Sequence, residues 1–352
     1  KFMSAPNFEA PNDVGGTDND NVYIVNIQVS DGNGGTDTQT ITVTVNNVNE
    51  VAAVDDIIRT NFDGTAFDVP EWALLFNDTT ESGTLDITGV SNESSLDVTN
   101  PAGNVVNIDD DGSTANGGSF DYTASNGTST GTGSVQVFNK NGGGNVTGTS
   151  ANEILVGDGD GDTFDGGSGV DIILAGGGSD TIVADQNDHV LDGGSGTDTL
   201  RVGSNFTSSS NAHIANIENV TLTAAVTLSL ANQTEAFTIT GSSGADVITG
   251  GAGADTITGG AGGDRMTGGS GAGVVDTFVI GSGQTTLSIG GSGNNGTIFG
   301  YDTITDFNLA VDKLSLNGTP FAASNTSGTN GSNSSLTIGG NQISSHAITN
   351  GI

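Results

Sequence analysis

The strongest constraint on this chain is a nine-residue repeat that keeps its register over long stretches. From Gly148 to Arg201 the sequence divides without a gap into the rows GTSANEILV, GDGDGDTFD, GGSGVDIIL, AGGGSDTIV, ADQNDHVLD and GGSGTDTLR. A second block starts at Gly241 with GSSGADVIT, GGAGADTIT and GGAGGDRMT, and its fourth row, GGSGAGVVDTFV, has three extra residues before the aspartate. Glycines at the first, second and fourth places allow positive φ and a tight turn, whereas the apolar eighth place is typical of a short inward-pointing strand. Each row therefore predicts one turn and one strand, so that two rows complete a coil and rows two apart stack.

Stacking places the eighth residues of the rows in an inner core and the sixth residues in columns along the edges. The predicted core residues are Leu155, Phe164, Ile173, Ile182, Leu191 and Leu200 in the first block and Ile248, Ile257, Met266 and Phe278 in the second. The predicted columns are Asp162, Asp180 and Asp198; Glu153, Asp171 and His189; Asp246 and Asp264; and Asp255 and Asp276.

These acidic columns need a cation. Two carboxylates on coils about 4.8 Å apart repel by about 3.5 kcal/mol at an effective dielectric constant of about 20. A Ca²⁺ ion bonds oxygen at about 2.4 Å, so one ion shared by two turns matches the coil spacing, and backbone carbonyls of the glycine turns complete its ligands. We therefore predict multiple Ca²⁺ ions, with ligands at Glu153, Asp158, Asp160, Asp162, Asp171, Asp180, Asp198, Asp246, Asp255, Asp264 and Asp276.

One row departs from this pattern at its sixth place. His189 offers nitrogen where a calcium ion prefers oxygen. We expect a weak or missing ion between Asp171 and His189, and Asp188 is a further candidate ligand that would compensate.

The pattern GGxGxDxUx in these rows resembles the RTX calcium-binding nonapeptide repeat. The resemblance implies a parallel β-roll, export through a type I secretion channel and a place outside the cell. Residues 214–223 and 226–230 resemble the calcium-free rungs that join RTX blocks. Residues 301–307 and 312–316 resemble the C-terminal capping strands of the family.

The sequence before the repeats predicts a β-hairpin followed by short strands. Residues 22–29 and 40–45 alternate apolar and polar side chains on either side of the turn-rich segment 30–35. This hairpin resembles the last one of bacterial cadherin-like and VCBS repeats, and the strings LLFND and GSFDYTA further along resemble the same adhesin families. The resemblance implies β-sandwiches. It also places Asn49, Glu50, Asp55 and Asp56 at a linker, which either binds a cation or is simply polar.

The expected fold class is all-β, with Ig-like or cadherin-like β-sandwich units followed by a calcium-binding parallel β-roll or β-solenoid. We expect the C-terminal half of a cadherin-like sandwich at 1–50 and a cadherin-like or VCBS-type sandwich at 51–140. The RTX β-roll then covers 141–282, with its nonapeptide blocks at 148–201 and 241–279 joined by calcium-free rungs, and a C-terminal β capping region covers 283–352.

Charge and motif content exclude several function classes. The chain has 41 Asp and Glu against 6 Lys and Arg, a net charge of −35, and this negative field repels nucleic acid and anionic lipid. It has no cysteine for disulfides or thiolate metal sites and no apolar run long enough for a membrane span. The zinc-hydrolase motif HExxH does not occur. We therefore expect a protein that is not an enzyme and that does not insert into membranes.

Two functions are compatible with these features. The first is an extracellular structural or adhesive protein of the adhesin or S-layer type at a bacterial cell surface, which calcium folds and stiffens for adhesion or for assembly into a surface layer, matrix or filament. The alternative is the secretion and folding tail of a type I secreted enzyme or toxin whose catalytic part lies outside this sequence. Expected partners are calcium, further copies of the chain through the incomplete N-terminal sandwich or the solenoid surface, and a host-surface or glycan ligand.

Overall fold

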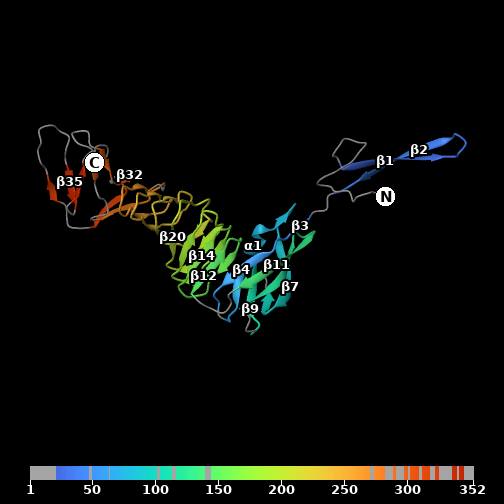
Figure 1. The fold of residues 1–352 in the computed structure, drawn as a ribbon, viewed down its shortest axis with the longest axis horizontal. Coiled ribbons are helices and arrows are strands. Elements are labelled where there is room, and N and C mark those ends of the chain that lie inside the picture. Colours follow the sequence, from blue (N-terminus) through green and yellow to red (C-terminus); the bar gives the residue numbers. More distant parts are fainter. Residues whose placement is uncertain are drawn as a thin grey trace.

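The computed structural model describes residues 21–46, 50–62, 64–100, 104–112, 116–138, 144–269, 273–281, 288–290, 297–299, 302–308, 311–317, 322–324, 335–338 and 341–344. Apart from the short helix α1 (Glu71–Leu74) and the 3₁₀ turn η1 (Leu75–Asn77), the regular structure in these residues is β-strand. The all-β class is therefore confirmed. Figure 1 shows the order of the parts, from an N-terminal hairpin through a β-rich unit into a stack of parallel strands.

The N-terminal hairpin has the strands that its alternating pattern predicts. Strands β1 (Val22–Ser30) and β2 (Thr36–Thr44) pair antiparallel in a sheet of their own. Their apolar side chains Val25, Ile27 and Ile41 are exposed. An isolated two-stranded sheet buries little surface, so this hairpin contributes no core to the rest of the described structure.

Residues 51–138, here called the upstream unit, form two sheets around one core. Its strands are β3 (Val51–Ala52), β4 (Asp56–Thr60), β5 (Phe67–Pro70), β6 (Thr79–Thr80), β7 (Asp86–Ser94), β8 (Leu96–Thr99), β9 (Val105–Asp110), β10 (Gly117–Ser125) and β11 (Thr130–Phe138). Strands β4, β11, β10 and β7 are neighbours in one sheet, β5, β9 and β8 form another, and β3 pairs with β6. Buried side chains from both larger sheets, including Phe120, Tyr122 and Ile108, belong to the same core.

The repeats form a parallel β-solenoid of about seven turns. One face is a nine-stranded sheet of β12 (Asn145–Thr149), β14 (Thr163–Gly167), β17 (Thr181–Ala184), β20 (Thr199–Val202), β23 (Asn219–Leu222), β25 (Thr238–Thr240), β27 (Thr256–Thr258), β29 (Thr277–Gly281) and β33 (Lys313–Asn317). The other face consists of β13 (Ile154–Val156), β15 (Ile172–Leu174), β18 (Val190–Asp192) and β22 (Ile214–Ala215), followed in a second sheet by β21 (Phe206–Thr207), β24 (Thr227–Ser229), β26 (Val247–Thr249), β28 (Arg265–Thr267) and β32 (Thr303–Ile304). The short strands β16 (Gly177–Gly178) and β19 (Ser195–Gly196) pair within the turns.

The stacking of rows two apart is confirmed by the register. Leu155 pairs with Ile173, which pairs with Leu191, while on the other face Phe164 pairs with Ile182. All ten predicted core residues are 0% exposed and lie in one continuous cluster.

The solenoid continues between the two repeat blocks and beyond the second. Strand β23 follows β20 in the nine-stranded sheet, and β25 follows β23, so on this face the rungs without turn aspartates keep the stack unbroken. At the far end β32 pairs with β28 and β33 with β29. The strands expected near 301–307 and 312–316 therefore add a last coil. Beyond it, β34 (Ala322–Ser324), β35 (Ser335–Ile338) and β36 (Asn341–Ser344) form an antiparallel sheet, and β30 (Ser288–Gly290) pairs with β31 (Thr297–Phe299).

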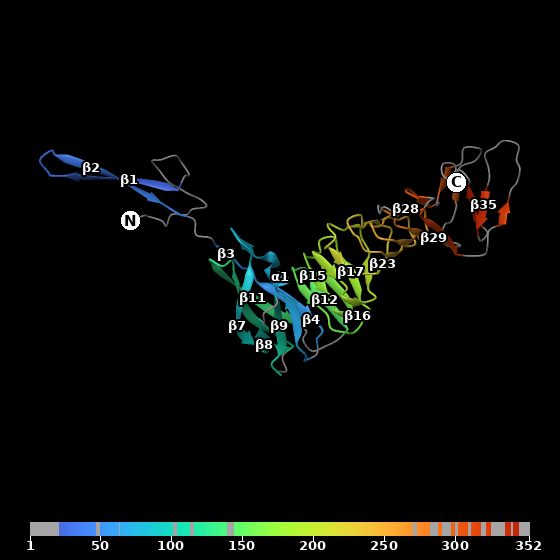
Figure 2. The same ribbon diagram turned by 180° about the vertical axis from the view of Figure 1, so that it is seen from behind.

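Strand β4 joins the upstream unit to the solenoid in a single hydrogen-bonded sheet. It pairs parallel with β11 on one side and with β13 on the other, giving the order β22-β18-β15-β13-β4-β11-β10-β7. The outer side chains Ile154, Val156 and Ile172 of the first coils belong to the core of the upstream unit. Figures 1 and 2 show α1 beside these coils from both sides. The two parts are thus connected by a sheet and a shared core, and not only by the chain.

Candidate metal centres of the stacked turns

The sixth-place carboxylates form hydrogen-bonded ladders along the solenoid. The backbone N–H of Asp162 donates to Asp180 Oδ1 at 2.8 Å, and that of Asp180 donates to Asp198 Oδ1 at 2.7 Å. On the other edge the N–H of Glu153 donates to Asp171 Oδ1 at 2.8 Å. Each carboxylate is therefore held by the turn of the preceding coil through one of its two oxygens.

The second block has the same ladders. The N–H of Asp246 donates to Asp264 Oδ1 at 2.9 Å, and that of Asp255 donates to Asp276 Oδ1 at 3.0 Å across the three-residue insertion. The structure thus brings together the pairs that the register predicts in both blocks.

The ladders also continue through three acidic residues that the sequence did not single out. The N–H of Asp198 donates to Glu218 Oε2 at 2.8 Å. Those of Asp264 and Asp276 donate to Asp302 Oδ1 and Asp312 Oδ1, each at 3.1 Å. These residues lie outside the nine-residue rows, because insertions lengthen the coils in which they occur. In the sequence, these three residues are marked only by their position, since each is an acidic residue shortly before a short strand with apolar residues.

The second oxygen of several ladder carboxylates has no partner. Oδ2 of Asp171, Asp180, Asp198 and Asp264 is buried and accepts no hydrogen bond. A buried, unpaired carboxylate oxygen costs free energy, and native structures compensate for it with a donor or an ion. The row of such atoms is what a hard cation shared between coils would bind, so the ladder residues fit Ca²⁺.

The glycine at the first place of a row makes room for this free oxygen. A Cβ at Gly166 would lie 2.5 Å from Asp171 Oδ2, and one at Gly259 would lie 2.5 Å from Asp264 Oδ2. Gly167, at the second place, has φ +88° and packs against the carbonyl of Thr149 in the coil before. The turns therefore stack backbone on backbone, with their carbonyls next to the carboxylates.

Side chains alone do not complete a metal site. Among the described residues, no three His, Asp or Glu side chains converge in a group suited to a metal ion. A Ca²⁺ ion takes six to eight oxygens, so backbone carbonyls of the turns are needed as further ligands. When bound, the ion supplies the positive charge that the columns lack.

Burial and mutual repulsion raise the pKa values of the ladder carboxylates. Burial first, and then neighbouring carboxylates, raise the pKa of Asp171 and of Asp180 to about 6 and that of Asp264 to about 7. The pKa of Asp255 rises to about 6 by burial, with Asp276 contributing. Without a cation, the charged column is therefore unfavourable at neutral pH.

His189 interrupts the ladder of its edge. Its backbone N–H donates to the main-chain oxygen of Asp171 at 2.7 Å, and its ring stacks on Phe76 of η1 with the centroids 3.8 Å apart. Asp188 is buried and has one oxygen, Oδ1, without a partner. Burial raises its pKa to about 7, and the charges of Asp171 and Asp185 add to the effect. The geometry thus places Asp188 within electrostatic reach of Asp171, and the weak ion at His189 stays a prediction.

At the first coil, the side chains of Arg59 in β4 and of Asn61 just after it take the place of a preceding turn. Arg59 Nε donates to Glu153 Oε1 at 2.6 Å in an ion pair. Asn61 Nδ2 donates to Asp162 Oδ2 at 2.5 Å, and the N–H of Asp158 donates to Asn61 Oδ1 at 3.1 Å. A guanidinium and an amide therefore satisfy the first carboxylate of each column. The other predicted ligand of this coil, Asp160, donates its N–H to Asp158 Oδ1 at 2.8 Å.

The predicted linker ligands are dispersed. Asn49 lies outside the described residues, and the side chain of Glu50 is exposed. Asp55 accepts a hydrogen bond from the N–H of Ser134 at 3.0 Å, while the neighbouring Asp56 is buried in the upstream unit.

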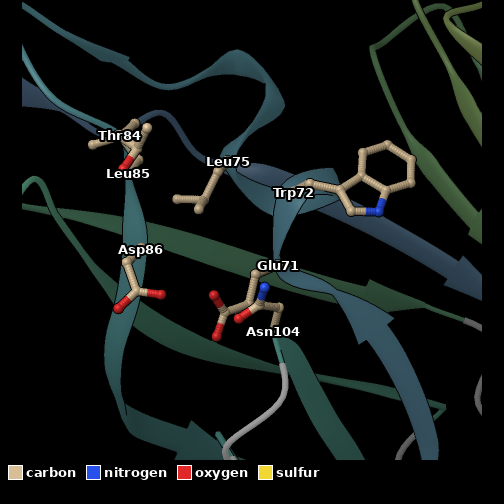
Figure 3. Close-up of a pocket in the computed structure, with 7 residues that line it drawn as sticks. All are labelled: Glu71, Trp72, Leu75, Thr84, Leu85, Asp86 and Asn104. Carbon is tan, nitrogen blue, oxygen red and sulfur yellow. The ribbon is translucent and has the colours of Figure 1, made fainter.

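The upstream unit also has a surface pocket of about 420 Å³, lined by Glu71, Trp72, Leu75, Thr84, Leu85, Asp86 and Asn104. Burial and the nearby Asp86 raise the pKa of Glu71. Figure 3 shows the Trp72 indole directed away from these two carboxylates, and it is 46% exposed. Trp72 therefore lies at the rim of this pocket.

Comparison with known proteins agrees with the site geometry. A search of curated proteins found no relative. In the described residues, no helix has the length and apolar character of a membrane span. The family model of the RTX calcium-binding nonapeptide repeat (4 copies) matches residues 147–182, 180–205 and 240–275. The solenoid of this chain therefore contains RTX calcium-binding repeats, which form a structural fold and are typical of secreted proteins.

Proposed function

We propose that this protein is a non-enzymatic, extracellular structural protein in which Ca²⁺ ions shared between stacked turns fold and stiffen the solenoid. The observation that supports it best is the row of buried, unpartnered Oδ2 atoms at Asp171, Asp180, Asp198 and Asp264. In each of these four carboxylates, the other oxygen, Oδ1, accepts a hydrogen bond from a backbone N–H of the coil before it. A cation in the column replaces repulsion between coils by attraction to both.

The adhesive or assembly role within this proposal is favoured by the shared sheet. Strand β4 is hydrogen bonded to the upstream unit and to the first coil at once. Such a joint transmits force from one part to the other, which suits a stalk, surface layer or filament better than a detachable secretion tail. We propose that the upstream unit is a cadherin-like or VCBS-type sandwich and that the protein acts at a bacterial cell surface.

Calcium titration tests the proposal. The EDTA-treated protein is titrated with Ca²⁺, and separately with Mg²⁺, while far-UV circular dichroism and small-angle scattering follow strand content and size. We expect a compact, β-rich particle with Ca²⁺ but not with Mg²⁺. Asp180→Asn moves the midpoint to higher calcium concentration, whereas the control Asp97→Asn, at an exposed position of β8, leaves it unchanged. Equal strand content and size in EDTA and in Ca²⁺ contradict the proposal.

The same experiment separates the two functions. Growth into large assemblies on addition of Ca²⁺ supports the layer or filament role. A monomer that folds with Ca²⁺ but neither assembles nor binds cell surfaces favours the alternative of a folding tail for a secreted enzyme or toxin.

A further inference from the structure

A second group of oxygen atoms lies outside the repeats, inside the upstream unit. It is centred on the hydroxyl of Tyr122, in β10. Four acceptor oxygens lie within hydrogen-bond distance of Tyr122 Oη: the carbonyl of Val54 at 3.1 Å, the carbonyl of Leu74 at 3.4 Å, and Oδ1 and Oδ2 of Asp78 at 3.0 and 2.9 Å. A phenol has one proton to donate. Most of these oxygens therefore face Tyr122 Oη without a hydrogen between them.

Two further oxygens in this group have no partner at all. Asp56, at the start of β4, is 6% exposed. Its Oδ1 accepts from Asn77 Nδ2 at 3.0 Å, but its Oδ2 is buried and accepts no hydrogen bond, and the same holds for Asn77 Oδ1. The charge of Asp78 and the hydroxyl of Tyr122 both act on the Asp56 carboxylate, so this carboxylate belongs to the same group.

Hydrogen-bond donors and positive charge are both scarce here. The N–H of Val54 donates to Asp78 Oδ1 at 2.7 Å, and Asn77 Nδ2 and Tyr122 Oη supply the other donors. Residues 51–138 contain one basic side chain, Arg59, and it is ion-paired with Glu153 at the solenoid. A buried carboxylate, Asp56, beside a half-buried one, Asp78, is unfavourable without a counter-ion. An oxygen-rich group with neutral amide and carbonyl members is what a hard divalent cation binds.

We propose that this group is a calcium site separate from the RTX turns, with side-chain ligands from Asp56, Asn77 and Asp78 and the carbonyl of Val54. Tyr122 positions the Asp78 carboxylate. The sequence pointed to Asp56 only as part of a linker with Asn49, Glu50 and Asp55, whereas the fold gives it a different set of partners. The site connects β4 to the end of η1.

A cation in this site also acts on the solenoid. Asn77 and Asp78 directly follow Phe76, whose ring stacks on His189. Fixing the end of η1 to β4 therefore fixes the segment that lies on the third coil. Calcium in the upstream unit and calcium in the repeats then stabilise the same joint from its two sides.

Terbium luminescence and ion counting on the full chain test this site. Tb³⁺ binds calcium sites and emits when a nearby aromatic ring transfers energy to it. We expect sensitised emission from the wild type that Ca²⁺ displaces. Tyr122→Phe lowers this emission but keeps its bound calcium. Asp56→Asn lowers the emission by the same amount and binds one Ca²⁺ ion fewer per chain, as counted by equilibrium dialysis and elemental analysis.

A repeat variant separates this site from the solenoid ions. Asp180→Asn reduces the calcium bound in the repeats but retains the Tyr122-sensitised emission. Because asparagine is isosteric with aspartate and removes a buried charge, Asp56→Asn is expected to fold in Ca²⁺ as the wild type does, which circular dichroism verifies. The site is refuted if folded Asp56→Asn binds as many Ca²⁺ ions as the wild type, or if Tyr122→Phe leaves the emission unchanged. Either result leaves the calcium role of the repeats intact.

Discussion

Protons should replace calcium in holding the solenoid together. The perturbation is acidification of the EDTA-treated protein from pH 8 to pH 4. In the folded chain the pKa values of Asp171 and Asp180 are raised to about 6, and that of Asp264 to about 7, by burial and then by neighbouring carboxylates. In the unfolded chain these groups have the ordinary pKa of about 4. The folded state therefore binds protons more tightly than the unfolded state does.

The direction of the pH effect follows from this difference. A raised pKa in the folded state gives stability that is fully present below pH 4 and is lost as the pH rises through 6 to 7. A folded-state pKa of about 6 against about 4 in the unfolded chain corresponds to about 3 kcal/mol for each of Asp171 and Asp180. That is close to the repulsion of about 3.5 kcal/mol expected between two charges at the coil spacing. Neighbouring groups are coupled, so the total is smaller than the sum over all of them.

Thermal and urea unfolding in EDTA, followed by circular dichroism from pH 4 to pH 8, measure this effect. We expect the apo solenoid to be most stable at about pH 4 and to lose several kcal/mol by pH 8, where it no longer folds without Ca²⁺. With excess Ca²⁺ the order reverses, since the ion competes with protons for the same oxygens. Apo stability that rises with pH over this range would refute the idea that uncompensated carboxylates oppose folding.

Three substitutions test other parts of the structure. Gly166→Ala places a Cβ 2.5 Å from a ladder carboxylate oxygen, so it raises the calcium midpoint and costs about 1–3 kcal/mol, whereas Gly159→Ala, with open space around it, changes neither. Ile182→Ala removes a side chain with no exposed surface and lowers the urea-unfolding free energy of the Ca²⁺-bound protein by about 2–5 kcal/mol; a loss below 1 kcal/mol contradicts a packed solenoid core. Arg59→Gln leaves Glu153 buried without its cation and costs about 3 kcal/mol in the same assay, and adding Glu153→Gln restores most of it if the ion pair is the cause.

The solenoid was predictable because its chemistry is local and repeated. Leu155, Ile173 and Leu191 occur at a constant spacing of two rows, and a period of two rows per coil leaves no other way to stack them. The pairing of Asp162 with Asp180 follows from the same period. Which oxygen atoms ligate calcium at each turn stays a prediction.

Residues outside the period were found only in the folded chain. Glu218, Asp302 and Asp312 extend the ladders from coils lengthened by insertions, so their distance along the sequence gives no register. The structure also shows one carboxylate, Glu153, paired with an arginine from 94 residues earlier. Neither kind of contact leaves a repeated signal in the sequence.

The sequence by itself thus determined the parallel coils, their inner core and the acidic columns, because each follows from a nine-residue pattern of glycine, aspartate and apolar residues. Only the tertiary structure decided that β4 serves both the upstream unit and the first coil, and that Asp56, Asn77, Asp78 and Tyr122 meet. Those contacts join segments that are far apart in the chain and have no common period. They depend on how two sheets close over one core, and that packing is a property of the whole fold.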